Sequence, residues 1–124
     1  MNLRRPKRIL LVEDEALVAM LLEDIVFDLG CEIVGPAMRF EQAAALIESE
    51  TLDAAILDVN LGGRLSYPLA ERLTERKVPF AFATGYGSLG VEWNADVPVL
   101  RKPFETNLVS SVLTDLLGGV TCSE

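Results

Sequence analysis

Apolar stretches of strand length alternate along this chain with segments whose apolar residues recur at helical spacing. Residues 8–12 form the first apolar run. A helical pattern follows it, with apolar residues at Leu17, Val18, Leu21, Leu22, Ile25 and Leu29. Positions three and four apart fall on one side of a helix, whereas short unbroken apolar runs are typical of strands buried on both faces. The pattern predicts a strand and then a helix that ends at Gly30.

The same alternation continues along the chain. Further strands are predicted over residues 31–36, 54–58, 78–84 and 96–100, and further helices over about 39–50, 67–76 and 104–116. Glycines at positions 85, 87 and 90 make any helix between the fourth and fifth strands short, late or mobile. Strand and helix units that repeat in this way predict an α/β fold, with a parallel sheet covered by helices on both faces.

The chain has the size of one ordinary domain. Its 124 residues suffice for a full hydrophobic core and leave no room for a second module, so we expect one domain over residues 1–124, with its core at about 8–117. No apolar run is long enough to cross a bilayer, and the basic amino-terminal residues lack the apolar core of a signal peptide. These features predict a soluble cytoplasmic protein without a membrane anchor.

The charge distribution argues against nucleic acid as a partner. The formal net charge is −8, although residues 1–8 contribute four positive charges, so the rest of the chain carries −12. A folded domain with this excess of carboxylates repels the phosphate backbone of DNA or RNA. We therefore expect no nucleic-acid partner, and we expect the short basic segment to be solvated.

Residue types that are rare or missing exclude several kinds of chemistry. The chain has no histidine, which excludes Ser-His-Asp and Cys-His catalysis and zinc sites built on imidazole. Cys31 and Cys122 are too few and too isolated to form a disulfide framework or a metal cluster. This cysteine usage is consistent with a reducing compartment.

Chemically active residue types stand at the ends of four predicted strands. Asp58 ends the third strand, which is an unbroken apolar run. Glu13 and Asp14 follow the first strand, Thr84 ends the fourth, and Lys102 follows the fifth. The carboxyl ends of parallel strands meet at one edge of the sheet, and ligands of open α/β sheets bind outside that edge. We therefore expect these five residues to share one site.

Three carboxylates at one edge need a positively charged ligand. Two unit charges about 5 Å apart repel by about 3 kcal/mol at an effective dielectric constant of about 20. With no histidine or cysteine at this edge, the oxygen donors favour Mg²⁺, which binds carboxylates together with phosphate oxygens. Lys102 adds an ammonium and Thr84 a hydroxyl, and both groups suit the oxygens of a transferring phosphoryl group. The residues predict Mg²⁺-dependent phosphoryl transfer with Asp58 as the nucleophile.

Four short motifs, in this order, resemble those of a known family. They are Val-Glu-Asp-Glu at 12–15, Ile-Leu-Asp at 56–58, Ala-Thr-Gly at 83–85 and Lys-Pro-Phe at 102–104. With these separations the chain resembles the receiver domain of two-component response regulators over residues 8–117. The resemblance implies a flavodoxin-like, doubly wound sheet of five parallel strands in the order 2-1-3-4-5.

The resemblance also implies roles for individual residues. Asp58 looks like the phosphoacceptor, and it would contribute to the metal site as well. Glu13 and Asp14 look like the acids that bind Mg²⁺, and Asn60 like the residue that offers a main-chain carbonyl to the metal. Lys102 looks like the lysine that pairs with the phosphate.

One stretch is similar to an atypical receiver subfamily known informally as FAT GUY. Residues 79–86 match its Pro-Phe-x-Phe-Ala-Thr-Gly-Tyr signature. The resemblance implies that Thr84 is the switch hydroxyl and that the peptide bond before Pro103 is cis. Val99 stands where receivers usually carry an aromatic switch residue on the fifth strand. Tyr86 is the nearby aromatic residue available to replace it, and whether it switches or packs over the loop stays open.

The loop after Asp58 departs from the family pattern. It lacks the common proline and contains Gly62 and Gly63, which should loosen it. We expect the flanking residues Asn60 and Tyr86 to tune two rates: the rate at which phosphate is lost from Asp58, and the rate at which partner proteins gain access to it.

The resemblance implies a signalling role instead of an enzymatic one. We expect a stand-alone response regulator that accepts a phosphoryl group on Asp58 from a sensor histidine kinase or a histidine phosphotransfer protein. It would assist its own phosphorylation and dephosphorylation and then change the surface around strands four and five. Because no output domain fits in the chain, we expect a downstream protein target or a phosphorelay, with the receiver as a monomer or weak dimer.

Two alternatives remain open from the residues. The first is an interaction module that keeps the acidic edge but binds its partner independently of phosphorylation. The second is a flavin or nucleotide binder of the same fold class. It is disfavoured because Glu13 and Asp14 occupy the turn after the first strand, where such proteins carry a glycine-rich phosphate loop.

Overall fold

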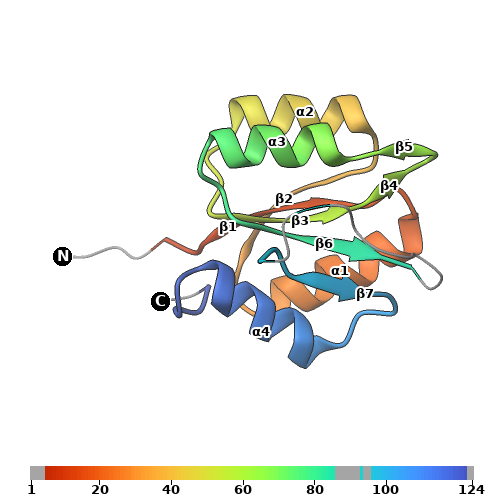
Figure 1. The fold of residues 1–124 in the computed structure, drawn as a ribbon. Coiled ribbons are helices and arrows are strands. Elements are labelled where there is room, and N and C mark those ends of the chain that lie inside the picture. The colour runs from red at the N-terminus through yellow and green to blue at the C-terminus, as the bar shows by residue number, and fades with distance from the viewer. Residues whose placement is uncertain (1–4, 86–92, 94–95, 123–124) are drawn as a thin grey trace.

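A five-stranded parallel sheet forms the centre of the computed structural model, which describes residues 5–85, 93 and 96–122. The strand order is β2-β1-β3-β6-β7 (Figure 1). In that order the strands are Glu32–Ala37, Arg8–Val12, Ala54–Asp58, Phe80–Thr84 and Val99–Arg101. Apart from a short hairpin after β3, this is the predicted order 2-1-3-4-5, so the flavodoxin-like fold is confirmed.

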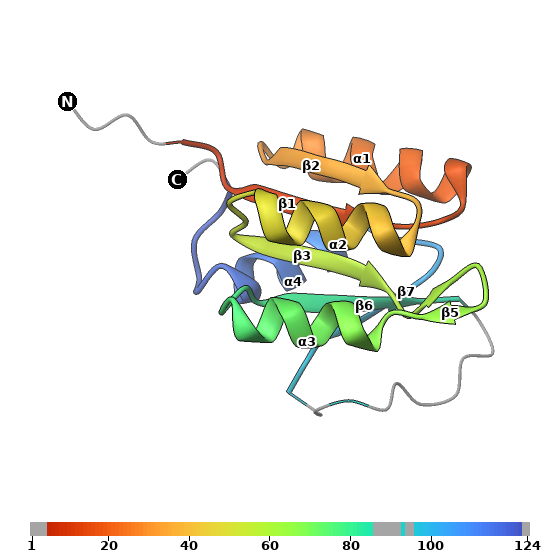
Figure 2. The same ribbon diagram turned by 90° about the horizontal axis from the view of Figure 1, so that it is seen from above.

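Helices cover both faces of the sheet. Helices α1 (Ala16–Asp28) and α4 (Thr106–Leu116) lie on one face, and α2 (Phe40–Ser49) and α3 (Tyr67–Glu75) lie on the other (Figures 1 and 2). None of the helices among the described residues is long and apolar enough to cross a bilayer. The predicted short or mobile helix between the fourth and fifth strands, and Tyr86 with it, lies outside the described residues.

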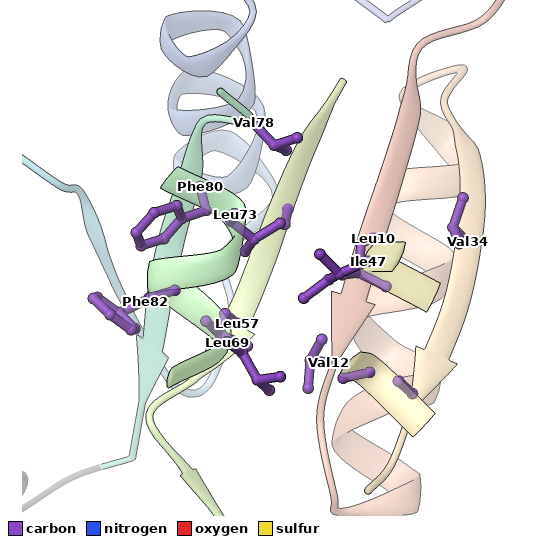
Figure 3. Packing of buried hydrophobic residues seen from close by; sticks show 14 of the residues in the cluster. Leu10, Val12, Val34, Ile47, Leu57, Leu69, Leu73, Val78, Phe80 and Phe82 are labelled. Carbon is purple, nitrogen blue, oxygen red and sulfur yellow. The ribbon is translucent and has the colours of Figure 1, made fainter. Parts of the chain in front are cut away.

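The unbroken apolar strands are explained by burial on both faces. Side chains of successive strand residues point to opposite faces. Leu10 and Val12 of β1 therefore pack with Ile47 toward α2 and α3 (Figure 3), whereas Ile9 and Leu11 pack toward α1 and α4. The central strands β3 and β6 are buried at every position. The sheet is thus a rigid support for the residues at its ends.

Trp93 packs in a cluster of aromatic side chains. The ring of Trp93 stacks on Tyr67 at 5.8 Å between centroids and meets the edge of Phe82 at 5.9 Å. Phe80 also contacts Trp93, at 6.1 Å. Trp93 therefore packs against β6 and the first turn of α3, close to the carboxyl end of β3.

The loop after Asp58 differs from its prediction. Asn60–Leu61 (β4) and Arg64–Leu65 (β5) pair as a short antiparallel hairpin. Gly62 and Gly63, with φ of +60° and +93°, supply the left-handed backbone of its turn. The Gly62 amide donates to Asp14 Oδ2 at 2.9 Å, and the Gly63 amide donates to Asn60 Oδ1 at 2.7 Å. The expectation that these glycines loosen the loop is wrong, because they permit a tight turn that is fastened to Asp14.

The expectation for the cysteines is also wrong. Cys31 and Cys122 form a disulfide across 91 residues of sequence, with their Cα atoms 4.9 Å apart. Cys31 lies between α1 and β2, and Cys122 follows α4. The two residues look isolated in the sequence, but α1 and α4 pack on the same face and bring them together. Because the two cysteines are paired, they do not indicate a reducing compartment.

Gly35 occupies a position where a side chain would be costly. It lies in β2 at φ +99°, before the cis bond to Pro36, and a Cβ there would stand 2.6 Å from the Ala37 nitrogen and 3.0 Å from the Leu11 oxygen. Gly119, after α4, has a similar φ of +96°, but a Cβ there would meet nothing within 4 Å. The two glycines share a backbone conformation and differ in the space around them.

We expect Gly35→Ala to reduce the free energy of unfolding by about 3 kcal/mol and Gly119→Ala by about 1 kcal/mol. Both substitutions force a left-handed alanine, but only the first also places Cβ against two backbone atoms. Urea unfolding followed by circular dichroism measures both values. Equal losses would contradict the assigned steric clash.

Candidate phosphoryl and metal site

The register of the sheet brings the predicted site residues to one edge. Val12 pairs with Leu57, so the residues that follow them, Glu13 and Asp58, lie level with each other. Asp58 pairs in turn with Ala83, the residue before Thr84. Thr84 pairs with Arg101, and the Lys102 amide donates to the Thr84 carbonyl at 2.8 Å. All of these residues therefore meet at the carboxyl ends of the strands.

Lys102 links two buried carboxylates. Its Nζ lies 2.6 Å from Glu13 Oε1 and 2.9 Å from Asp58 Oδ2. Glu13 is 1% exposed and Asp58 is 5% exposed. Burial alone lowers the pKa of Lys102, but its contacts with Glu13 and Asp58 outweigh burial and raise the pKa above its usual value. Lys102 is therefore a fixed positive charge at this edge.

The surroundings of Asp58 favour its neutral form, whereas those of Lys102 favour its charged form. Burial raises the pKa of Asp58 to about 7, and the neighbouring Glu13 carboxylate adds to the increase. Lys102 opposes both effects. The ionised form of Asp58 is thus destabilised by its surroundings, and an additional positive charge would favour it.

Three carboxylates converge at this edge of the sheet. Oxygen atoms of Glu13, Asp14 and Asp58 lie within 4.8 Å of one another. Glu13 Oε1 is buried and accepts no well-aligned hydrogen bond from any residue that the structure describes, so its contact with Lys102 is an ion pair only. An all-oxygen set with a buried, incompletely satisfied carboxylate suits a hard divalent cation such as Mg²⁺.

The rim of the site is held by backbone groups. Asp14 Oδ2 accepts the Gly62 amide of the hairpin, which fixes the carboxylate beside Asp58. The Asn60 amide donates a long hydrogen bond of 3.4 Å to Asp58 Oδ1, and Asn60 is exposed. The role of the Asn60 carbonyl as a metal ligand stays a prediction.

Two residues that sequence reasoning missed support the site. The Ser66 hydroxyl, fully buried, donates to the backbone carbonyl of Asp58. A serine just before a helix with proline in its first turn suggests a helix cap, but Ser66 makes no side-chain cap bond. The Glu15 amide donates to Glu13 Oε2 at 3.0 Å and so orients that carboxylate. Only the Val-Glu-Asp-Glu motif hinted at Glu15.

The structure describes some of the residues predicted to take part in switching, but not Tyr86. Thr84 is buried at the end of β6. The bond between Lys102 and Pro103 is cis, as the resemblance implied. Val99, at the start of β7, is 44% exposed, so the usual position of the aromatic switch carries a small aliphatic side chain on the surface. Tyr86 lies outside the described residues.

Comparison with known proteins agrees with this geometry. Residues 9–112 match the family described as response regulator receiver domain. The phyllosphere-induced regulator PhyR of Methylorubrum extorquens is 32% identical over 114 residues, which cover 88% of this chain and 43% of PhyR. The chain spans about two fifths of the length of the curated relatives it matches.

Solved structures show the same fold. The solution structure of SdrG from Sphingomonas melonis Fr1 is 45% identical, with a TM-score of 0.81, and the match covers 93% of this chain and 99% of SdrG. The receiver domain of a sensor histidine kinase from Pseudomonas aeruginosa PAO1 is 25% identical, with a TM-score of 0.79, and the match covers 91% of this chain and 98% of that one. That structure has a magnesium ion coordinated in its active site cleft.

We expect Asp58→Asn to stabilise the fold at pH 8 in the presence of a chelator. The pKa of Asp58 is about 7 in the folded state and near 3.8 when the chain is unfolded, so its ionisation removes stability as the pH rises through this interval. Asparagine does not ionise, and the gain should be about 2 kcal/mol, less than the full shift because Lys102 loses a partner.

Urea unfolding at pH 8, with and without Mg²⁺, measures this gain. Mg²⁺ should stabilise the wild-type protein and shrink or reverse the difference. Asp115→Asn removes an exposed carboxylate on α4 and serves as the charge-matched control. A loss of stability in Asp58→Asn under the chelator would contradict the proposed repulsion.

Proposed function

The chain belongs to the family of response regulator receiver domains, and we propose that Asp58 is its phosphoacceptor in a Mg²⁺-dependent transfer from a phosphohistidine. One observation carries the proposal: the carboxylates of Glu13, Asp14 and Asp58 converge within 4.8 Å, beside the Lys102 ammonium. This arrangement combines a nucleophile, oxygen ligands for a cation, and a fixed charge for a phosphoryl oxygen.

The bonds that form and break in the transfer belong to Asp58 and the phosphodonor. An Asp58 carboxylate oxygen attacks the phosphorus, a phosphorus–oxygen bond forms, and the phosphorus–nitrogen bond to the donor imidazole breaks. The imidazole leaves with the bonding electron pair and takes up a proton from solvent. Mg²⁺, held by Glu13, Asp14 and Asp58, would supply charge neutralisation for the phosphoryl oxygens. Lys102, already in contact with Asp58, would pair with the product phosphate.

Ser66 and Glu15 act as positioning residues in this proposal. The Ser66 hydroxyl holds the Asp58 backbone through its carbonyl, which limits movement of the nucleophile. The Glu15 amide holds Glu13 through Oε2. Both act through the residues they hold, and the Glu15 carboxylate also lies 3.9 Å from Lys102 Nζ.

An apolar surface beside the site supports a protein as the phosphodonor. Leu17, Met20, Leu21 and Phe27 lie on one side of α1 and are exposed, Leu17 by 80% and Phe27 by 69%. α1 begins two residues after Asp14, so a partner bound there reaches Asp58. We propose that a sensor histidine kinase or a histidine phosphotransfer protein docks on this surface.

The response would pass through Thr84 and the aromatic cluster of Phe82, Tyr67 and Trp93. Because Val99 is aliphatic, an aromatic ring on β7 cannot report the state of the site. Thr84 lies two residues after Phe82, whose ring contacts both Tyr67 and Trp93. We propose that this cluster transmits the state of the phosphorylated site to the surface near β6 and β7, where a downstream protein binds.

Acetyl phosphate with Mg²⁺ should add about 80 Da to the wild-type protein. Asp58→Ala should gain no adduct, and Asp14→Asn should be labelled at least about tenfold more slowly because a metal ligand is lost. Intact mass spectrometry measures both, with Asp115→Asn as a control that should be labelled like the wild type. An adduct that persists in Asp58→Ala, or that forms equally in a chelator, contradicts the proposal.

Trp93 is the single tryptophan and reports the response directly. Its emission should change when Asp58 is labelled, because its ring packs on the cluster next to β6. In Thr84→Ala, labelling should continue while the change in emission is lost. Thr106→Ala, on the exposed start of α4, is the control. An unaltered emission change in Thr84→Ala would exclude Thr84 as the switch.

A further inference from the structure

The disulfide between Cys31 and Cys122 lies away from the acidic edge of the sheet. The disulfide is at the end of the sheet where β1 begins, whereas Asp58 is at the end where β3 stops. Both views show the segment after α4 beside the amino end of β1 (Figures 1 and 2). We propose that Cys31 and Cys122 form a reversible thiol–disulfide site that fastens residues 118–122, here called the strap, to the domain.

The strap begins at the carboxyl end of α4. Gly118 and Gly119 follow the helix with φ of +75° and +96°, and their amides donate to the carbonyls of Asp115 at 3.2 Å and Thr114 at 2.8 Å. A Cβ at either glycine would meet nothing within 4 Å. The two glycines therefore end the helix in a left-handed turn, and other contacts hold the strap beyond them.

Beyond these two glycines, two described links hold the strap to the rest of the domain. One is the disulfide to Cys31, which lies between α1 and β2. The other is a hydrogen bond of 2.9 Å from the Lys7 amide to the Cys122 carbonyl. Lys7 in turn accepts the Glu32 amide through its own carbonyl, at 2.9 Å, so the strap extends the hydrogen bonding at the edge of β1 and β2.

Packing under the strap is incomplete. A cavity of about 80 Å³ is lined by Leu113, Leu117, Thr121 and Cys122, together with Leu29 at the end of α1. Atoms that line a cavity lose contacts, so the strap gains less from apolar packing than a fully packed segment would. Without the disulfide, the part of the strap after Gly119 would be held by one described backbone hydrogen bond and by burial around Cys122. These contacts would have to offset the entropy of ordering that part, and we expect it to open.

Opening of the strap makes the exchange chemistry possible. In the closed state Cys31 is 6% exposed and Cys122 is 3% exposed. In the open state, the thiolate of one cysteine attacks a low-molecular-weight disulfide, forming a mixed disulfide and releasing a thiol. The second cysteine then attacks the protein sulfur of that mixed disulfide and releases the second thiol. The low-molecular-weight disulfide takes both electrons, and a dithiol reverses the reaction.

The experiment uses the intact protein equilibrated with oxidised glutathione or with dithiothreitol, then denatured and labelled with N-ethylmaleimide. Oxidised wild type should take up no label and carry no glutathione, whereas reduced wild type should be labelled at both cysteines. Cys31→Ser and Cys122→Ser should each retain a glutathione adduct, because the resolving thiol is missing. Mixed disulfides at both cysteines of the wild type, or disulfide-linked dimers, would overturn the proposal.

Hydrogen exchange of the wild type, which needs no substitution, tests the strap itself. Reduction should speed exchange of the Lys7 amide by at least about tenfold and leave the amides of β3 unchanged. Labelling of Asp58 by acetyl phosphate should be the same within about twofold in both redox states, since the two sites lie at opposite ends of the sheet. An exchange rate of the Lys7 amide that does not change on reduction would overturn the proposal that the disulfide fastens the strap. A failure to label Asp58 in both redox states would contradict only its role as the phosphoacceptor.

Discussion

The site depends on electrostatic repulsion that the fold itself creates. Glu13, Asp14 and Asp58 are brought within 4.8 Å, and burial raises the pKa of Asp58 to about 7. One ammonium, that of Lys102, offsets part of this negative charge. A cation is therefore favoured at this edge before any partner arrives, and an Asp58 oxygen next to such a cation is suited to accept a phosphoryl group.

The sheet maintains this unfavourable arrangement because its other parts are strongly stabilised. The strands that carry the site are apolar and covered on both faces, and their pairing fixes Glu13 level with Asp58. The hairpin holds Asp14 through Gly62, and Ser66 holds the backbone of Asp58. Strain at a functional site is stored where the surrounding structure allows no relaxation. The opposite end of the sheet is free of this constraint, and there the disulfide can open and close without disturbing the acids.

Much of the fold and most of the site could be predicted from local patterns. Unbroken apolar runs located the five main strands, and their alternation with helical spacing required a parallel sheet with two covered faces. In such a sheet all carboxyl ends meet at one edge, so the positions of Asp58, Thr84 and Lys102 after three strands were enough to place them together. The class of fold, the edge that carries the chemistry and the residue types available there therefore follow from local sequence patterns.

Contacts between segments that are distant in sequence, and contacts that compete with a local alternative, depend on how the whole chain folds. Cys31 and Cys122 meet across 91 residues because α1 and α4 share a face, which no local pattern records. Ser66 has the features of a helix cap, yet its hydroxyl bonds the Asp58 carbonyl, since the hairpin turns the chain back toward β3. Gly62 could have loosened its loop, but Asp14 accepts its amide. For Ser66 and Gly62 a long-range partner overrides the local preference, and sequence reports the preference alone.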